Sequence, residues 1–161
     1  MEIDRGMEVA DFIAPAGVII GLRARDKRQL LEELAQRAAM DLGLERSAIL
    51  GALLAREELG STGVGRGIAV PHARIIGHSR LYGLIARLER AIDFAAIDDQ
   101  PVDLACLLLT PGAAAAEHLS ALASVSRRLR DKSVADRMRA ARSGEDLYAV
   151  LTGMPRQTAA V

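Results

Sequence analysis

The residues that decide the fold and the site read Arg56-Glu57-Glu58-Leu59-Gly60-Ser61-Thr62-Gly63-Val64-Gly65-Arg66-Gly67-Ile68-Ala69-Val70-Pro71-His72-Ala73-Arg74. The stretch begins as the end of an amphipathic helix, passes through four glycines and leaves through a short apolar run toward His72. Glycine permits positive φ angles, so such a loop can turn successive amide hydrogens toward one anion. Flanking arginines can bind phosphate oxygens with two parallel hydrogen bonds. The stretch therefore predicts a phosphate site beside a histidine.

Simpler interpretations stand beside this one. A glycine-rich connection between a helix and a strand is usually only a turn, and a single histidine before an arginine is usually a surface residue. Two familiar nucleotide motifs do not fit, because no Gly-Lys-Ser/Thr follows and the loop enters a strand instead of opening a helix. From spacing alone, the phosphate site is one hypothesis among these.

The order of the motifs resembles a known family. Arg56-Glu57, then Gly60-Ser61-Thr62-Gly63-Val64-Gly65, then Gly67-Ile68-Ala69-Val70-Pro71-His72 is similar to the signature of the type-2 enzyme IIA domain. This is the fructose/mannitol and nitrogen-regulatory class of the bacterial phosphoenolpyruvate phosphotransferase system. The resemblance covers roughly residues 15–152. It predicts one domain over 1–161, with its core at about 15–152 and a flexible tail at 154–161.

The resemblance implies a role for each site residue. His72 would accept the phosphoryl group, Arg56 would clamp it, and His118 would match the second histidine of the family. The backbone of the glycine loop would bind the phosphoryl oxygens, with Ser61 or Thr62 adding a hydroxyl donor. The phosphate-binding residues expected on this basis are Ser61, Thr62, Gly63, Gly65 and Gly67. No metal and no cofactor is needed on this account.

The roles of three other residues are less clear from the sequence. On spacing alone His118 is a core-facing histidine, because it shares a helix face with Leu122, Val125 and Leu129. His78 lies in a polar loop without a motif match. Ala73 stands where the family often has glycine, so the backbone there is the least certain part of the match.

Two aspartates and the single cysteine are also interpreted as structural residues. Asp98 and Asp99 could suggest a metal pair, but aspartates before a proline favour turn chemistry. The single cysteine, Cys106, lies in the apolar run Val102 to Leu109 and is expected to be buried and inert.

Composition limits the class of protein. The 161 residues suit one domain, and 21 Lys and Arg balance 21 Asp and Glu, which argues against nucleic-acid binding. No apolar run approaches the length of a membrane span, so membrane insertion is not expected. The first eleven residues lack a signal-peptide pattern, and one cysteine fits a reducing compartment. The expected location is the cytoplasm.

The pattern of elements predicts an α/β fold. We expect three layers, α/β/α, around a mixed sheet of four or five strands. Strands are predicted at 18–24, 68–70, 82–88 and 102–109. Helices are predicted after an Asp26 cap up to Gly43, from Ser47 to Gly60, from Ala115, and at 133–141 and 144–151.

The resemblance leaves the use of the phosphate open. A phosphohistidine on a histidine phosphocarrier protein (HPr-like) would be the donor. A nitrogen-regulatory protein would then signal to a regulated partner, such as a potassium-transport or sensor component. The alternative is a detached IIA component of a fructose/mannitol-type transporter that passes phosphate to a IIB domain. A third possibility is a binding module that carries no phosphate.

Overall fold

The computed structural model describes residues 6–112 and 115–154, so the tail predicted at 154–161 lies outside these residues apart from Met154. Helices and strands occur near most of the predicted positions. In chain order the elements are η1 (Val9–Asp11), β1 (Val18–Leu22), α1 (Lys27–Leu42), α2 (Arg46–Glu58), β2 (Gly63–Gly65), β3 (Ile68–Ala69), β4 (His72–Ile75), β5 (Tyr82–Ile92), β6 (Val102–Pro111), α3 (Ala115–Arg130), α4 (Lys132–Ala140) and α5 (Gly144–Thr152).

The sheet is mixed, as predicted, but it has six strands where four or five were expected. Its order is β1-β5-β6-β3-β2, and β4 also pairs with β6. β5 runs antiparallel to β6, whereas β3 and β4 both run parallel to β6 along the same edge. The additional strands are β2, which forms within the glycine stretch, and β4, which begins just after Pro71. Short, glycine-containing segments of this kind carry almost no periodic signal.

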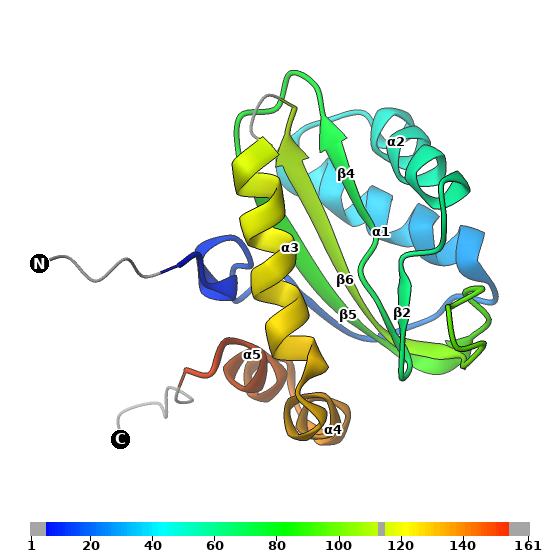
Figure 1. Cartoon of the computed structure of the whole chain (residues 1–161), viewed down its shortest axis with the longest axis vertical. Coiled ribbons are helices and arrows are strands. Elements are labelled where there is room, and N and C mark those ends of the chain that lie inside the picture. The colour runs from blue at the N-terminus through cyan, green and yellow to red at the C-terminus, as the bar shows by residue number, and fades with distance from the viewer. Residues whose placement is uncertain (1–5, 113–114, 155–161) are drawn as a thin grey trace, which may run out of the picture.

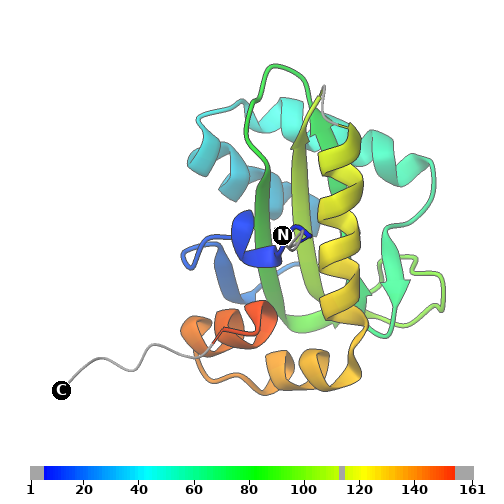
Figure 2. The same ribbon diagram turned by 60° about the vertical axis from the view of Figure 1, so that its left-hand side comes forward.

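Helices cover both faces of the sheet and confirm the three-layer prediction (Figures 1 and 2). Alternate residues of β6 point to opposite faces. Leu107 packs with the residues of α1 and α2, whereas Leu108 packs with those of α3, α4 and α5. Because both faces are buried, the strand reads as a continuous apolar run.

The ends of α1 follow their predicted chemistry. The Asp26 carboxylate accepts a hydrogen bond from the Gln29 amide, and Gly43 closes the helix at φ 66°. The start predicted for α2 was wrong: the N-cap is Glu45, without a side-chain cap bond, and Ser47 already lies in the first turn. The turn closes through the backbone, because the Ala48 amide donates to the Glu45 carbonyl.

The packed core begins earlier than residue 15. Val9, Phe12 and Ile13 are buried against α3 and α5, so the 3₁₀ turn η1 belongs to the domain. None of the helices in the described ranges combines the length and the apolar character that a membrane span requires.

Candidate functional site

His72 is the first residue of β4 and pairs with Leu108 of β6. Its side chain is half-buried, and Nδ1 lies 2.8 Å from the carbonyl oxygen of Val70. A carbonyl can only accept, so Nδ1 carries the ring proton. The second nitrogen, Nε2, therefore carries the lone pair with which the ring can attack.

Arg56 holds that second nitrogen. It lies in the last turn of α2, and its Nε–H donates to Nε2 of His72 at 3.2 Å. Its Nη1 donates to the carbonyl of Gly60 at 2.8 Å, which orients the guanidinium. A phosphoryl group on Nε2 would place its oxygens where this arginine already points. Arginine suits that position because its donors match phosphate geometry.

His118 lies in the first turns of α3 and faces His72. The two ring centroids are 5.3 Å apart, with the planes tilted by 57°. His118 is 8% exposed, and its Nδ1 lies 2.8 Å from the hydroxyl oxygen of Thr110, which is fully buried. If the hydroxyl donates, Nε2 of His118 carries the proton and becomes a donor toward the space in front of His72.

Burial keeps both rings uncharged. Desolvation lowers the pKa of His72, the Val70 carbonyl opposes that shift, and the Arg56 charge adds to it. Desolvation also lowers the pKa of His118, and the charges of His72, Arg74 and Arg56 act in the same direction. Both imidazoles are therefore mainly neutral at pH 7, the form in which a ring nitrogen can attack.

The start of the glycine loop lies beside the site, but its donors are already used. The Thr62 amide and hydroxyl both donate to the Glu57 carboxylate. The Ser61 hydroxyl donates to the Phe94 carbonyl and accepts from the Gly63 amide. Neither hydroxyl is turned toward His72. The expected anion nest is therefore not formed by these groups in this state.

Two glycines of the predicted phosphate set lie elsewhere. The Gly67 carbonyl accepts from the Leu104 amide, whereas His72 pairs with Leu108, four residues further along β6. At about 3.3 Å per residue, that separation is about 13 Å. Gly65 and Gly67, with φ 104° and 80°, shape the β2–β3 turn. The structure does not bring them to the histidine.

Sequence reasoning missed three contributors to the site: Glu57, Val70 and Thr110. The Val70 carbonyl contacts the Nδ1 of His72, two residues further along the chain, and the Thr110 hydroxyl contacts the Nδ1 of His118, eight residues further along. Both contacts depend on how the ring and its partner are oriented, and residue spacing gives no signal for that orientation. Glu57 did have a spacing signal, because it lies on the same apolar face of α2 as Leu53.

The remaining candidates are structural. Asp98 accepts from the amides of Arg66 and Gln100, which is turn chemistry, and no group of three or more metal-ligating side chains occurs in the described ranges. Cys106 is buried, and burial raises the pKa of its thiol to about 12. Nε2 of His78 is buried without a hydrogen-bond partner in the described residues, and nothing connects it to the site.

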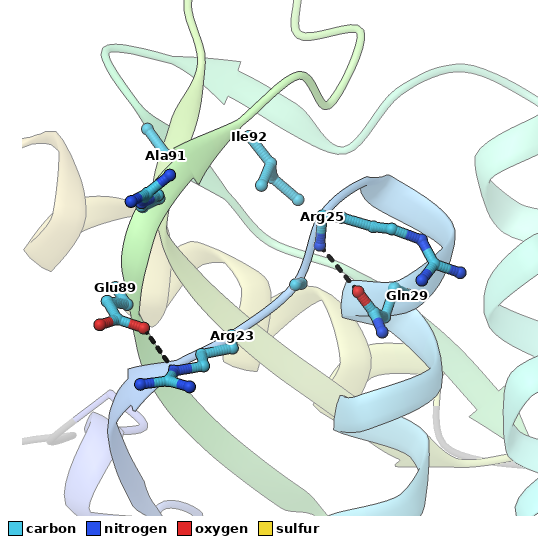
Figure 3. A pocket seen from close by; sticks show the side chains of 8 residues that line it. Arg23, Arg25, Gln29, Glu89, Ala91 and Ile92 are labelled. Carbon is cyan, nitrogen blue, oxygen red and sulfur yellow. Dashed lines mark hydrogen bonds and ion pairs between the residues drawn. The ribbon is translucent and has the colours of Figure 1, made fainter.

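A cavity of about 710 Å³ lies away from the histidines (Figure 3). It is formed between the chain leading into α1 and the last residues of β5. Figure 3 shows Arg23 paired with Glu89 at its edge, a contact of 2.6 Å. Its lining contains no histidine, so it cannot serve the chemistry of His72. The lining residues are Arg23, Ala24, Arg25, Gln29, Glu89, Arg90, Ala91 and Ile92.

Comparison with known proteins agrees with this geometry. The family described as "Phosphoenolpyruvate-dependent sugar phosphotransferase system, EIIA 2" matches residues 11–154. A "Nitrogen regulatory protein" of Bradyrhizobium diazoefficiens is 45% identical over 154 residues, 96% of this chain and 100% of that protein. One from Escherichia coli K12 is 42% identical over 132 residues, 81% of each chain.

A solved structure gives the same result for the fold. The nitrogen regulatory protein IIA-Ntr from Neisseria meningitidis superimposes with a TM-score of 0.85 at 30% identity, covering 89% of this chain and 99% of that one. The family match runs from the last residue of η1 to just beyond α5, and it includes all of the histidine site. The chain therefore belongs to the EIIA 2 family of the phosphoenolpyruvate-dependent sugar phosphotransferase system.

Proposed function

We propose that the protein is a regulatory phosphoryl carrier whose His72 accepts a phosphoryl group and signals through its phosphorylation state. The observation that carries this proposal is the Nδ1 contact with the Val70 carbonyl, which leaves Nε2 as the unprotonated nitrogen. The names of the nitrogen regulatory relatives support the regulatory use. The proposed location is the cytoplasm, consistent with a single, buried cysteine.

The donor is a phosphohistidine on a histidine phosphocarrier protein. The Nε2 lone pair of His72 forms the new N–P bond while the N–P bond of the carrier breaks. The carrier ring, protonated on its other nitrogen, leaves as neutral imidazole with that electron pair. His72 keeps its Nδ1 proton and gains positive charge, which the Val70 carbonyl stabilises. Positioning and charge stabilisation are the protein's main contribution to this step.

Arg56 and His118 stabilise the bound phosphoryl group. The guanidinium of Arg56 moves from Nε2 to the phosphoryl oxygens, a change of one hydrogen-bond partner. The Nε2–H of His118 donates to another oxygen, with the tautomer held by Thr110. Ser61, Thr62 and Gly63 can contribute only if their present hydrogen bonds are exchanged. Gly65 and Gly67 shape the turn behind the site.

Regulation follows from the change of charge at a half-buried surface residue. A phosphoryl group adds about −1.5 to −2 charges near pH 7, enough to gate the binding of a partner. We place a potassium-transport or sensor component among the candidate partners. The alternative use is transfer of the phosphate to a IIB domain of a sugar transporter. It has weaker support, which comes from the sugar phosphotransferase system named in the description of the family.

The test is phosphorylation by the general phosphotransferase proteins and labelled phosphoenolpyruvate. Wild type should become labelled, and His72→Ala should carry no label. His118→Ala should accept phosphate more slowly, because one donor to the phosphoryl group is lost. Label retained on His72→Ala would refute the assignment of the acceptor. Unchanged kinetics in His118→Ala would remove the role of that histidine.

A further inference from the structure

Glu57, in the last turn of α2, has a side chain that is almost completely buried. It is 6% exposed, although an isolated buried carboxylate is costly. Its charge is compensated by Lys27, whose Nζ lies 3.5 Å away and also sits 4.5 Å from the centre of the Phe94 ring. Both carboxylate oxygens accept from Thr62, one from the amide and hydroxyl at 3.1 and 2.5 Å, the other at 3.0 and 2.9 Å.

The hydrogen bonds continue from Thr62 to the reactive ring. The Val70 amide donates to the Thr62 carbonyl at 2.9 Å, and the Val70 carbonyl accepts from His72 Nδ1 at 2.8 Å. Glu57 therefore fixes one end of a chain of three contacts, and His72 is the other end. Hydrogen bonds in such a chain polarise one another in a low-dielectric interior.

We propose that Glu57 is a positioning residue for phosphoryl transfer, holding His72 in its Nδ1–H tautomer through Thr62 and Val70. One helix end then controls both nitrogens of the ring. Arg56 contacts Nε2 directly, and Glu57 restrains Nδ1 at a distance. This inference rests on the proposed function, but the tautomer of His72 can be measured without any phosphate.

The charge of Glu57 supports the same role. Its field raises the pKa of His72, in opposition to the burial that lowers it. The attacking ring gains positive charge as the N–P bond forms, so a nearby carboxylate lowers the energy of that state. Glutamine at this position keeps the size and one acceptor oxygen but removes the charge. The variant therefore tests the charge and the second acceptor oxygen of Glu57 while its packing stays the same.

The experiment compares Glu57→Gln with wild type and with Glu58→Gln. Glu58 is the exposed neighbour, so its variant is the matched control for charge on α2. Nitrogen-15 NMR of the ring should show His72 as Nδ1–H in wild type and in Glu58→Gln. In Glu57→Gln the Nε2–H tautomer should gain population. The rate of phosphoryl acceptance should fall about tenfold, the lower end of the losses seen when the hydrogen-bond partner of a metal-bound histidine is removed.

Thr62→Val provides an independent variant. It removes the hydroxyl donor to Glu57 but keeps the Thr62 amide and carbonyl, so the chain weakens without breaking. The tautomer and the rate should shift in the same direction as in Glu57→Gln, by a smaller amount. This variant also decides the matter if Glu57→Gln does not fold.

The outcomes separate the two proposals. A tautomer unchanged in both variants would overturn the positioning role, even if the phosphorylation rate fell. Wild type that accepts no phosphate would refute the proposed function, and the tautomer shift would still test Glu57. A shifted tautomer with a rate equal to wild type would show that the chain orders the ring without contributing to transfer, which also overturns the proposal.

Discussion

The two neutral histidines make stability depend on pH. Their folded-state pKa values lie below 6.5, because burial disfavours the charged rings. As pH falls through 6.5, the unfolded chain binds protons before the folded one does, so the free energy of unfolding decreases. The contribution of the neutral rings is complete above that pH and is lost below it. Urea unfolding at pH 7.5 and 5.5 measures the loss.

The comparison is the double variant His72→Gln/His118→Gln. Its free energy of unfolding should fall less between the two pH values than that of wild type. The carboxylates are shared by both proteins, so their contribution cancels in the difference. An equal fall in both proteins would mean that neither histidine is held neutral by the fold.

Single residues show where sequence reasoning succeeded. Arg56, the glycine loop and His72 could be predicted together because they lie within one short stretch of sequence. In the structure, Nε of Arg56 lies 3.2 Å from Nε2 of His72. His118 could be placed only through the family resemblance, since helical spacing fits a core residue equally well. Thr110 was missed, because its contact with His118 depends on how β6 ends beside α3.

At the scale of elements, the long periodic segments were predicted, whereas the short strands β2 and β4 were not. α1 and β6 appear near their expected bounds because each has a continuous apolar pattern and clear end signals. β2 and β4 have three and four residues, and β2 contains two glycines. Their pairing is set by β3 and β6, not by their own propensities, so the glycine stretch was expected to form one loop.

Two glycines of the first half of the chain should respond in opposite ways to alanine. A Cβ on Gly63 would lie 2.7 Å from the Cβ and 2.9 Å from the Cα of Ala96, so the β2 backbone or its neighbour must shift. Gly63→Ala should cost about 1–3 kcal/mol, as overpacking does. Gly51 is exposed inside α2 with nothing near its Cβ position. Gly51→Ala should add about 0.5–1 kcal/mol.

Urea unfolding of both variants at one pH measures these changes. The Gly51 variant is the control for the general effect of alanine on chain entropy. Gly63→Ala with the stability of wild type would show that the packing of β2 against Ala96 is loose.

At the scale of the whole molecule, η1 and α5, from opposite ends of the described chain, pack together on the α3 face of the sheet (Figure 2). The Tyr148 hydroxyl donates to the Ile13 carbonyl at 2.6 Å, and Phe12 packs in the same cluster as Leu147 and Leu151. The sequence gives no periodic signal for this contact, because residues 6–17 contain only one short turn. The start of the core was therefore placed too late, at about residue 15.

The charge balance of the whole chain gives the last prediction. With 21 basic and 21 acidic residues, the formal net charge is zero at pH 7, and the isoelectric point is about 6.8. Adding about −1.5 to −2 charges on His72 should shift the band clearly toward the anode on a native gel. Wild type treated with phosphoenolpyruvate and the general phosphotransferase proteins should show this shift, and His72→Ala should show none.

The same gel separates a phosphoryl carrier from a module that only binds partners. His118→Ala should give a shifted band of lower intensity at early times, because it accepts phosphate slowly. Wild type without any shift, but still retained by a partner protein, would favour the binding module. A shift that persists after a IIB domain is added would favour regulation, since a transport component would lose its phosphate to that domain and return to the original position.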